Sequence, residues 1–549
     1  MKSLAQYFGR WGVPLEPVEV NEATEAYISA EIGEATTPSQ IAPLADLLPE
    51  DSSLSAQDQE AIAAVVGPGH LSVDAGDRLT HTVGCSLTDY LRLRDQGAKT
   101  GPQAIVRPTS TSQIAELLAV CSRRGINVVP YGGGTSVVGG LEHLDTENRP
   151  SIAVALEDMA EILKVNEVDS TVTVQPGVTG PTLERYLGAR GFTLGHLPQS
   201  WERATIGGYV ATRSAGQASS GFGRSDEMVE ALTVATPQGV ISLGRAPKSA
   251  AGPDLRQLFI GSEGVFGIVS EVTLRIRRAV EHAKYEGLMF PSFAAGQEAF
   301  REIVQAGFRA DVMRLSDETE TTTNLKMSAP GGRAGDLFQR YLRVRNVSGG
   351  ALAILGWHSH SSRLLSARRS AAWDIVRRHG GVTLGSGVGS AWKRHRFAGP
   401  YLRDVLLDRG YIVETLETAT HYSNIAALKS AVTEALTASL TTATTSVHVM
   451  CHISHVYETG CSLYFTVIAA ADADPIAQWW AAKRAASDAI VASAATISHH
   501  HAVGRDHAPW LTAEIGAEGV AVLQAVKDIV DPEGIMNPGK LIPDSQGTP

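Results

Sequence analysis

The stretch Pro130-Tyr-Gly-Gly-Gly-Thr-Ser-Val-Val-Gly-Gly140 decides how this chain is expected to fold. Upstream of it, Ser110 and Gln113 have the spacing of a helix-capping box, and Gly125 stands where a helix commonly ends in a left-handed residue. The apolar run 126–129 then predicts a short buried strand that leads directly into the glycines. The loop therefore follows a helix and a strand, and its amides and hydroxyls predict a nest for a phosphate or pyrophosphate.

The spacing of this loop differs from two other nucleotide-binding loops. It is not a G-x-G-x-x-G that opens a long amphipathic helix, and no acidic residue follows about 20 residues later in the context of a dinucleotide fold. No Gly-Lys-Ser/Thr follows, so it is not a P-loop. Because a glycine-rich loop alone fits a surface turn equally well, the flanking sequence has to decide.

Length and charge limit the classes of function. The chain has 549 residues, enough for three or four domain-sized units, and 43% of them are hydrophobic. The formal net charge of -11 argues against nucleic acid as a partner, because no basic stripe is present to replace counterions. An anionic substrate would have to be held by a few local arginine or histidine side chains.

The four cysteines, Cys85, Cys121, Cys451 and Cys461, form no C-x-x-C pair, so neither a disulfide framework nor a zinc ribbon is expected. This pattern is typical of a reducing compartment. The N-terminal residues lack the apolar core of a signal peptide, and no run of about 18 apolar residues occurs. We therefore expect neither secretion nor a membrane span, and a cytoplasmic location.

The first 100 residues predict helices and loops that pack on the next domain. From residue 102 onward, short apolar runs separated by Gly and Pro predict a strand-rich α+β domain. The expected strands are 104–106, 126–129, 152–155, 171–174, 232–235, 240–243 and 268–274. Two further glycine-rich segments, 195–216 and 261–267, lie in the same domain. Such clustering usually indicates close approach of the backbone to a ligand.

Three motifs carry a family resemblance: PYGGGTS at 130–136, PQSWERATIGGYVATRSAGQ at 198–217 and GSEGVFGIVSEVTLRI at 261–276. Together they resemble the PCMH-type FAD-binding domain of the vanillyl-alcohol oxidase fold. From about residue 70 to 540, the chain is similar to the alkyldihydroxyacetonephosphate synthase family. The resemblance implies a mostly helical N-terminal region, an FAD-binding domain, an α+β cap domain and a C-terminal segment that returns to the FAD domain. The corresponding ranges are 1–100, 101–279, 280–490 and 491–549.

The resemblance also implies which residues would bind FAD, without a covalent bond to the protein. They belong to the three motifs, together with His196 in a glycine-flanked loop, where a histidine is otherwise often a satisfied loop donor. The set is Pro130, Tyr131, Gly132, Gly133, Gly134, Thr135, Ser136, His196, Gln199, Ser200, Thr205, Gly207, Gly208, Thr212, Arg213, Ser214, Ala215, Glu263, Gly264, Gly267 and Ile268.

Two arginines of the cap domain match functional arginines of the family. The resemblance assigns Arg314 a role in activity and Arg403 the binding of the substrate phosphate. A guanidinium suits a phosphate monoester, because it donates two parallel hydrogen bonds and stays charged. The alternative without a function is a surface ion pair, since Asp404 directly follows Arg403.

Tyr464 stands at the position of the family's catalytic tyrosine. Its neighbours are apolar, so it fits a core strand aromatic equally well by sequence alone. Placed beside a flavin and an ester, its hydroxyl would exchange a proton with an entering or leaving oxygen.

The segment 498–504 contains His499, His500 and His501 in a row, and three adjacent histidines cannot all face one way on a helix or strand. Two interpretations compete: a proton-transfer cluster beside the flavin, or a metal site. The metal site would need histidines from another segment, and the candidates are His448, His452 and His455. The resemblance favours proton transfer, and we expect no metal.

The function implied by the resemblance is exchange of the acyl group of acyl-dihydroxyacetone phosphate for a long-chain alcohol, which forms an ether lipid without net redox. The main alternative is an FAD-linked 2-hydroxyacid or alcohol dehydrogenase or oxidase, because the segment 531–540 resembles the tail of those enzymes. A flavin-binding scaffold without turnover is a third interpretation. An amphiphilic substrate implies peripheral contact with the inner membrane, and the family resemblance allows a homodimer.

Overall fold

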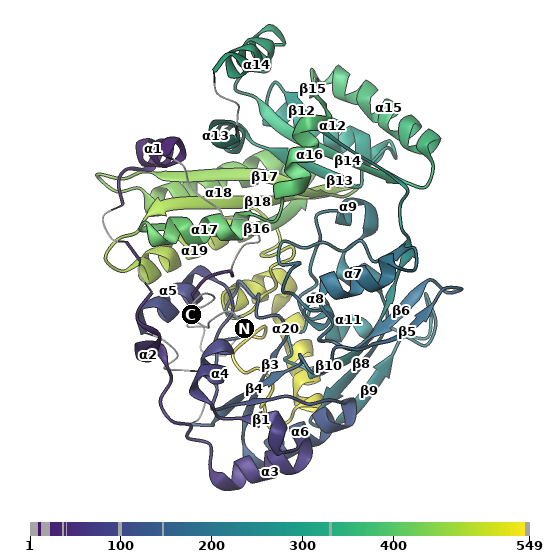
Figure 1. Ribbon diagram of the computed structural model, residues 1–549, viewed down its shortest axis with the longest axis vertical. Helices are drawn as coiled ribbons and strands as arrows, with labels where there is room; N and C mark the ends of the chain where they lie inside the picture. The colour runs from purple at the N-terminus through teal and green to yellow at the C-terminus, as the bar shows by residue number, and fades with distance from the viewer. Residues whose placement is uncertain are drawn as a thin grey trace.

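A computed structural model describes residues 9–12, 22–35, 38–39, 41–96, 101–144, 148–328 and 332–543. Two α+β units stack on each other, with the C-terminal segment running back into the first (Figure 1). The predicted α+β class is confirmed. Within the described residues, no helix is both long and apolar enough to span a membrane.

The N-terminal region is mostly helical, as predicted. Its helices are α1 (Glu22–Ile32), α2 (Leu44–Leu47), α3 (Ala56–Val66), α4 (Ala75–Thr80) and α5 (Leu87–Gln96). These helices do not pack together as one domain. Helix α3 packs on α6 (Thr111–Arg124) of the first domain, whereas α1 lies against the cap, beside strand β17 (Val447–Val456).

The first domain begins with the helix and strand that the sequence predicts. Helix α6 is capped by Ser110, whose hydroxyl accepts from the Gln113 amide at 3.2 Å, and Gly125 follows it with φ of +64°. Strand β3 (Asn127–Tyr131) then carries the chain into the glycine loop. It pairs in parallel with β4 (Ser151–Ala155), which also pairs with β2 (Ala104–Val106); β1 (Leu71–Ser72) completes the sheet.

A second, antiparallel sheet completes the first domain. Its strand order is β5 (Ile162–Asn166), β6 (Thr171–Val174), β10 (Ile268–Arg275), β8 (Val229–Thr236) and β9 (Gly239–Leu243). Short helices α7 (Gly180–Gly188), α8 (Ile206–Ala211), α9 (Ser219–Phe222), α10 (Ser225–Met228) and α11 (Arg256–Phe259) join these strands, and β7 (Phe192–Thr193) pairs with β11 (Arg277–Arg278). The three glycine-rich segments lie between these elements and the cap.

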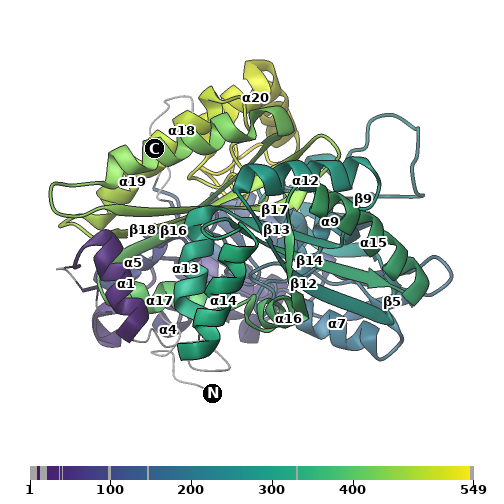
Figure 2. The ribbon, with the colours of Figure 1, turned by 90° about the horizontal axis from the view of Figure 1, so that it is seen from above.

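The cap is built on one seven-stranded antiparallel sheet. Its order is β15 (Val382–Leu384), β12 (His282–Phe290), β14 (Ala351–Ser359), β13 (Val312–Ser316), β17, β18 (Gly460–Ala470) and β16 (Tyr411–His421). The helices α12 (Phe293–Gln305), α15 (Ser362–Arg378), α18 (Ile425–Leu440) and α19 (Pro475–Ala492) bury the outer face in the largest apolar core. The inner face is covered by α1, α13 (Glu318–Ser328), α14 (Gly332–Val344), α16 (Gly385–His395) and α17 (Gly399–Asp408) and faces the first domain (Figure 2).

The C-terminal segment returns to the first domain, as expected. After helix α20 (Leu511–Val530), Met536 forms a parallel bridge with Val128, beside β3. The Lys527 ammonium anchors this segment, because it donates to the carbonyls of Val265 and Met536 at 2.9 and 2.6 Å and to Asp531 at 2.6 Å. The histidine triplet thus lies on a link between the cap and the first domain.

Candidate active site

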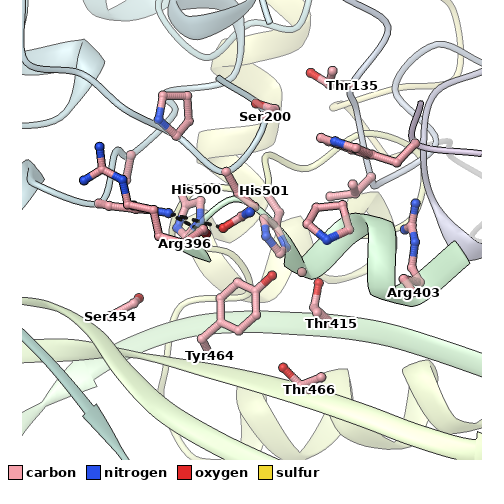
Figure 3. Close-up of a pocket in the computed structure, with 18 of the residues that line it drawn as sticks. Thr135, Ser200, Arg396, Arg403, Thr415, Ser454, Tyr464, Thr466, His500 and His501 are labelled. Atoms are coloured by element: carbon pink, nitrogen blue, oxygen red, sulfur yellow. Dashed lines mark hydrogen bonds between the residues drawn. The ribbon is translucent and has the colours of Figure 1, made fainter. Parts of the chain in front are cut away.

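A cavity of about 1080 Å³ lies between the glycine-rich loops of the first domain and the inner face of the cap sheet. Figure 3 shows Thr135 and Ser200 on one side of it and Tyr464, Thr415 and Thr466 on the other. The size suits a cofactor together with part of a substrate, since ligand pockets usually measure about 300–1,000 Å³.

Two glycine-rich loops form one wall because they pack directly on each other. A Cβ on Gly133 would lie 2.3 Å from the Arg203 carbonyl oxygen, and one on Gly132 would lie 2.6 Å from the Thr205 hydroxyl. Side chains at these positions would therefore push the loops apart. Gly208 has only the Thr205 hydroxyl within 4 Å of such a Cβ, so its backbone stays open to the cavity.

Most residues predicted to bind the cofactor line this cavity. Those that do are Pro130, Gly132, Gly133, Gly134, Thr135, Ser136, Gln199, Ser200, Thr205, Gly207, Gly208, Thr212, Ser214, Ala215, Glu263, Gly264, Gly267 and Ile268. Their backbone amides and hydroxyls are neutral donors, which suits a pyrophosphate in an acidic protein.

Three predicted residues lie outside the cavity wall, and this corrects the expectation. Tyr131 points away, because β3 alternates its side chains, and its hydroxyl donates to the Thr80 carbonyl at 3.1 Å. His196 is buried behind the wall, where Nε2 lies 2.7 Å from the Ser214 hydroxyl, and burial lowers its pKa to about 3. Arg213 turns outward, since its guanidinium donates to the carbonyl of Ile260.

The opposite wall is the inner face of the cap sheet. Tyr464 on β18 faces the cavity, and burial raises its pKa to about 12, so its hydroxyl is protonated at neutral pH. Its ring stacks on His452 of β17 with centroids 4.8 Å apart. Figure 3 shows the Tyr464 hydroxyl pointing to the side of the cavity where His500 and His501 lie. The ring centroids are 6.4 Å apart for Tyr464 and His500, and 5.6 Å for Tyr464 and His501.

Two histidines of the triplet line the cavity, and the third is buried behind the cavity wall. His500 and His501 line the cavity, and burial lowers the pKa of His501 to about 3, which keeps that ring neutral. His499 does not line it. Its ring is buried between Tyr457 and Glu417, with Nδ1 2.9 Å from the Glu417 carboxylate.

Arg314 lines the cavity but is held by cap residues. Its guanidinium donates to Glu320 at 2.6 Å and lies 3.1 Å from Nδ1 of His452. Burial alone would raise the pKa of Glu320, but His452 and Arg314 lower it to about 2. Because His452 also stacks on Tyr464, the contacts of His452 with Arg314 and Glu320 hold the surface on which the tyrosine ring packs.

Arg403 is buried in the cavity wall with unused donors. Its Nη1 donates to the Cys85 carbonyl at 2.9 Å, and the guanidinium carbon lies 4.5 Å from the centre of the Tyr90 ring. No described residue accepts a hydrogen bond from Nε or Nη2. Asp404 points elsewhere and accepts from the Trp11 amide at 2.7 Å, so the expected alternative of an exposed Arg–Asp pair is wrong.

The histidines of β17 do not gather into one metal site with the triplet. His448 lies at the far end of the strand, 2.8 Å from the Thr323 hydroxyl, and His452 pairs with Glu320. Only His455 approaches the triplet. Its ligand atom and those of Glu417, His499 and His500 lie within 4.8 Å of one another, a grouping able to reach one cation. Hydrogen bonds to the Glu417 carboxylate from the His499 ring and from the His500 backbone amide already hold these residues in place.

Sequence reasoning missed Glu417, Glu320 and Thr415. All three line or support the site, but none sits in a recognisable motif. Strand pairing brings Glu417 and Thr415 to the site, and helix α13 carries Glu320. Glu417 pairs with Tyr464 in the register of β16 and β18, and Thr415 pairs with Thr466. The alternation of β16 between buried core and cavity residues was the only local signal.

Comparison with known proteins decides the family. Residues 102–244 match the model described as FAD binding domain, and residues 279–541 match FAD linked oxidases, C-terminal domain. The chain is 30% identical over 484 residues to alkyldihydroxyacetonephosphate synthase of Dictyostelium discoideum, which covers 87% of this chain and 79% of that protein. The chain belongs to the alkyldihydroxyacetonephosphate synthase family.

Solved structures agree with this membership. One of an alkyldihydroxyacetonephosphate synthase is 27% identical and superposes with a TM-score of 0.81, covering 94% of this chain and 92% of the other. A p-cresol methylhydroxylase, 13% identical, has a TM-score of 0.67 over 90% of this chain and 99% of the other, which shows the same fold. The cofactor of this family member is FAD, as predicted from the sequence.

The loop packing predicts the effect of a single methyl group. Gly133→Ala should abolish flavin binding, because its Cβ would collide with the Arg203 carbonyl and separate the two loops. Gly188→Ala, at the end of α7, is the matched control, since nothing lies within 4 Å of its Cβ. The flavin-to-protein absorbance ratio of the two purified variants measures the effect. Equal ratios would contradict this account of the wall.

The hydrogen bonds around Glu417 predict that no metal ion is needed there. Purified protein should contain well below one zinc, iron or manganese ion per chain by mass spectrometry of the elements. Treatment with a chelator should leave the flavin spectrum unchanged. A metal centre would instead be established by one ion per chain in the wild type and by the loss of that ion in each of two variants, His455→Ala and His500→Ala.

Proposed function

We propose that this protein is an FAD-dependent enzyme that exchanges the acyl group of acyl-dihydroxyacetone phosphate for a long-chain alcohol. The observation that carries the proposal is Arg403, a buried arginine with two unused donors in the same cavity as Tyr464 and His500. A buried guanidinium with two nitrogens that lack acceptors is costly, so a ligand anion is the natural partner for Nε and Nη2. A phosphate monoester supplies the acceptors that its planar fork can reach.

The cavity also offers an apolar surface for an aliphatic chain. At one end of it, helices α1 and α17 and strands β16, β17 and β18 contribute a cluster of apolar side chains. These are Ile28, Ile32, Leu402, Leu406, Val413, Met450 and Ile468. Burial of about 0.8 kcal/mol per methylene would make a long chain a strong source of binding energy. A small 2-hydroxyacid would leave this surface unused.

The side chains present can manage the protons of the exchange. In the overall reaction, the carbon of the dihydroxyacetone unit loses its bond to the carboxylate and gains one to the alcohol oxygen, and the alcohol proton is given up. When bound, FAD supplies an electrophilic centre for this carbon. In this proposal, His500 takes the alcohol proton, and the protonated Tyr464 hydroxyl donates to the leaving oxygen; both residues line the cavity. Arg314 holds His452 in place, and His452 in turn supports the Tyr464 ring.

The amphiphilic substrate extends the proposal to a membrane surface and a cytoplasmic site of action. Helix α14 exposes Leu337 and Val344, which are 66% and 71% accessible, beside the exposed Arg340 and Arg343. A helix with apolar and basic exposed residues suits the surface of an anionic membrane. We also propose that FAD is held without a covalent bond and that the enzyme forms a homodimer, by analogy with the family.

The decisive experiment is anaerobic turnover without an electron acceptor. Flavin-loaded protein, palmitoyl-dihydroxyacetone phosphate and labelled hexadecanol should give free palmitate and labelled ether lipid in equal amounts, with the flavin still oxidised at the end. Net bleaching of the flavin by a 2-hydroxyacid, with no ether product, would support the dehydrogenase alternative instead. No response to either substrate would support a scaffold.

The role of Arg403 predicts a change in substrate affinity. Arg403→Lys should raise KM for the acyl substrate by about tenfold or more, because the loss of one charged hydrogen bond costs about 1.5–3 kcal/mol. The kcat should change less, and bound flavin should be retained. Arg377→Lys, on the exposed surface of α15, is the control. An unchanged KM in the Arg403 variant would remove it from phosphate binding.

A further inference from the structure

Glu417 is a fully buried carboxylate directly behind the histidine triplet. Its side chain is 0% exposed, and it lies on β16 opposite Tyr464 of β18. Its oxygens lie 2.9 Å from Nδ1 of His499 and 2.8 Å from Nδ1 of His500. They also accept from the backbone amide of His500 at 2.9 Å. A single side chain thus holds two adjacent histidines and the chain between them.

The protonation of these groups follows from their contacts. Burial alone would raise the pKa of Glu417, but His500 and His499 hold it well below its usual range. An ionised carboxylate only accepts hydrogen bonds, so Nδ1 of both rings must carry the proton. In the tautomer with its proton on Nδ1, an imidazole has a free lone pair on Nε2.

The two rings use Nε2 differently. In His499, Nε2 faces the Tyr457 hydroxyl, so both ring nitrogens are occupied by protein groups. Burial lowers the pKa of His499, which keeps the ring neutral. In His500, no described residue hydrogen-bonds to Nε2, and the ring lines the cavity (Figure 3). The groups that face His500 are Glu417 from β16, His455 from β17, Tyr464 from β18, and its neighbours His499 and His501.

We propose that Glu417 is the positioning residue of this site. It fixes His500 with an unprotonated Nε2 toward the substrate, and His499 acts through the carboxylate rather than on the substrate. The proposal rests on the proposed function, since the proton that Nε2 accepts is that of the entering alcohol. As the oxygen–carbon bond forms and the oxygen–hydrogen bond breaks, the proton passes to Nε2. Glu417 then stabilises the imidazolium through its hydrogen bond to Nδ1.

A coupled set of variants tests this role. Glu417→Gln should lower kcat by about 10²–10⁴-fold, because the amide cannot stabilise an imidazolium, while KM changes little. Glu417→Asp should recover part of the loss. In a His500→Ala background, Glu417→Gln should cause no further loss, since the two residues act as a unit. The matched control is Glu286→Gln, another buried glutamate of the cap sheet, which pairs with Arg369 away from the cavity.

A second measurement does not depend on turnover. Diethyl pyrocarbonate modifies unprotonated, accessible imidazole nitrogens, so peptide mapping of the flavin-loaded protein should find His500 modified and His499 unmodified. Glu417→Gln should change the rate at which diethyl pyrocarbonate modifies His500, and Glu286→Gln should leave that rate unchanged. If the proposed reaction fails but this pattern holds, the positioning role stands while the assigned substrate falls.

Three outcomes would overturn the inference. One is equal modification of His499 and His500. Another is a Glu417→Gln enzyme with a kcat within about threefold of the wild type, well short of a general-base loss. The last is an equally large loss from Glu417→Gln with and without His500. Flavin content and thermal unfolding of each variant identify a change that merely unfolds the site.

Discussion

The direct contact between the two glycine-rich loops of the first domain is the constraint on which the site depends. Gly132 and Gly133 lie against Thr205 and the Arg203 carbonyl with no room for a side chain. Arg203 itself donates to the Trp11 carbonyl, which ties the N-terminal segment to the same wall. The loops can therefore present backbone amides to a cofactor only as a pair. One loop alone would be an ordinary turn.

A second set of contacts joins this wall to the side chains proposed to act in catalysis. The Glu263 carboxylate accepts from the amides of Val503 and Gly504 at 2.9 and 2.7 Å, directly after the histidine triplet. Burial raises the pKa of Glu263 to about 7. Glu417 holds the other end of the triplet. The histidines are thus fixed between one carboxylate of the first domain and one of the cap, which places His500 between the loops and the sheet.

Much of the fold could be predicted because its signals are local. The cap of α6 at Ser110, the left-handed Gly125 and the glycines after β3 are encoded within one stretch of about 30 residues, the span of one helix–strand unit. The cofactor wall followed from such motifs. The place of Glu417 could not be predicted in this way, because it reaches the site through the pairing of β16 with β18. No short pattern encodes that register.

The histidines of β17 show the same limit. By alternation, His448 and His452 share one strand face, whereas His455 belongs to the other. A register shift between Ile453 and Val456 changes this, and His455 turns to within 5.1 Å of the His499 ring centre. The sequence did not indicate that irregularity.

The central claim is that these loops and the cap sheet enclose a flavin whose ring faces His500 and Tyr464. A crystal structure of the FAD-loaded protein tests it most directly. The account predicts the pyrophosphate against the amides of Gly132–Ser136 and the isoalloxazine ring in contact with both side chains. A ring bound elsewhere, or turned so that neither His500 nor Tyr464 touches it, would contradict the account.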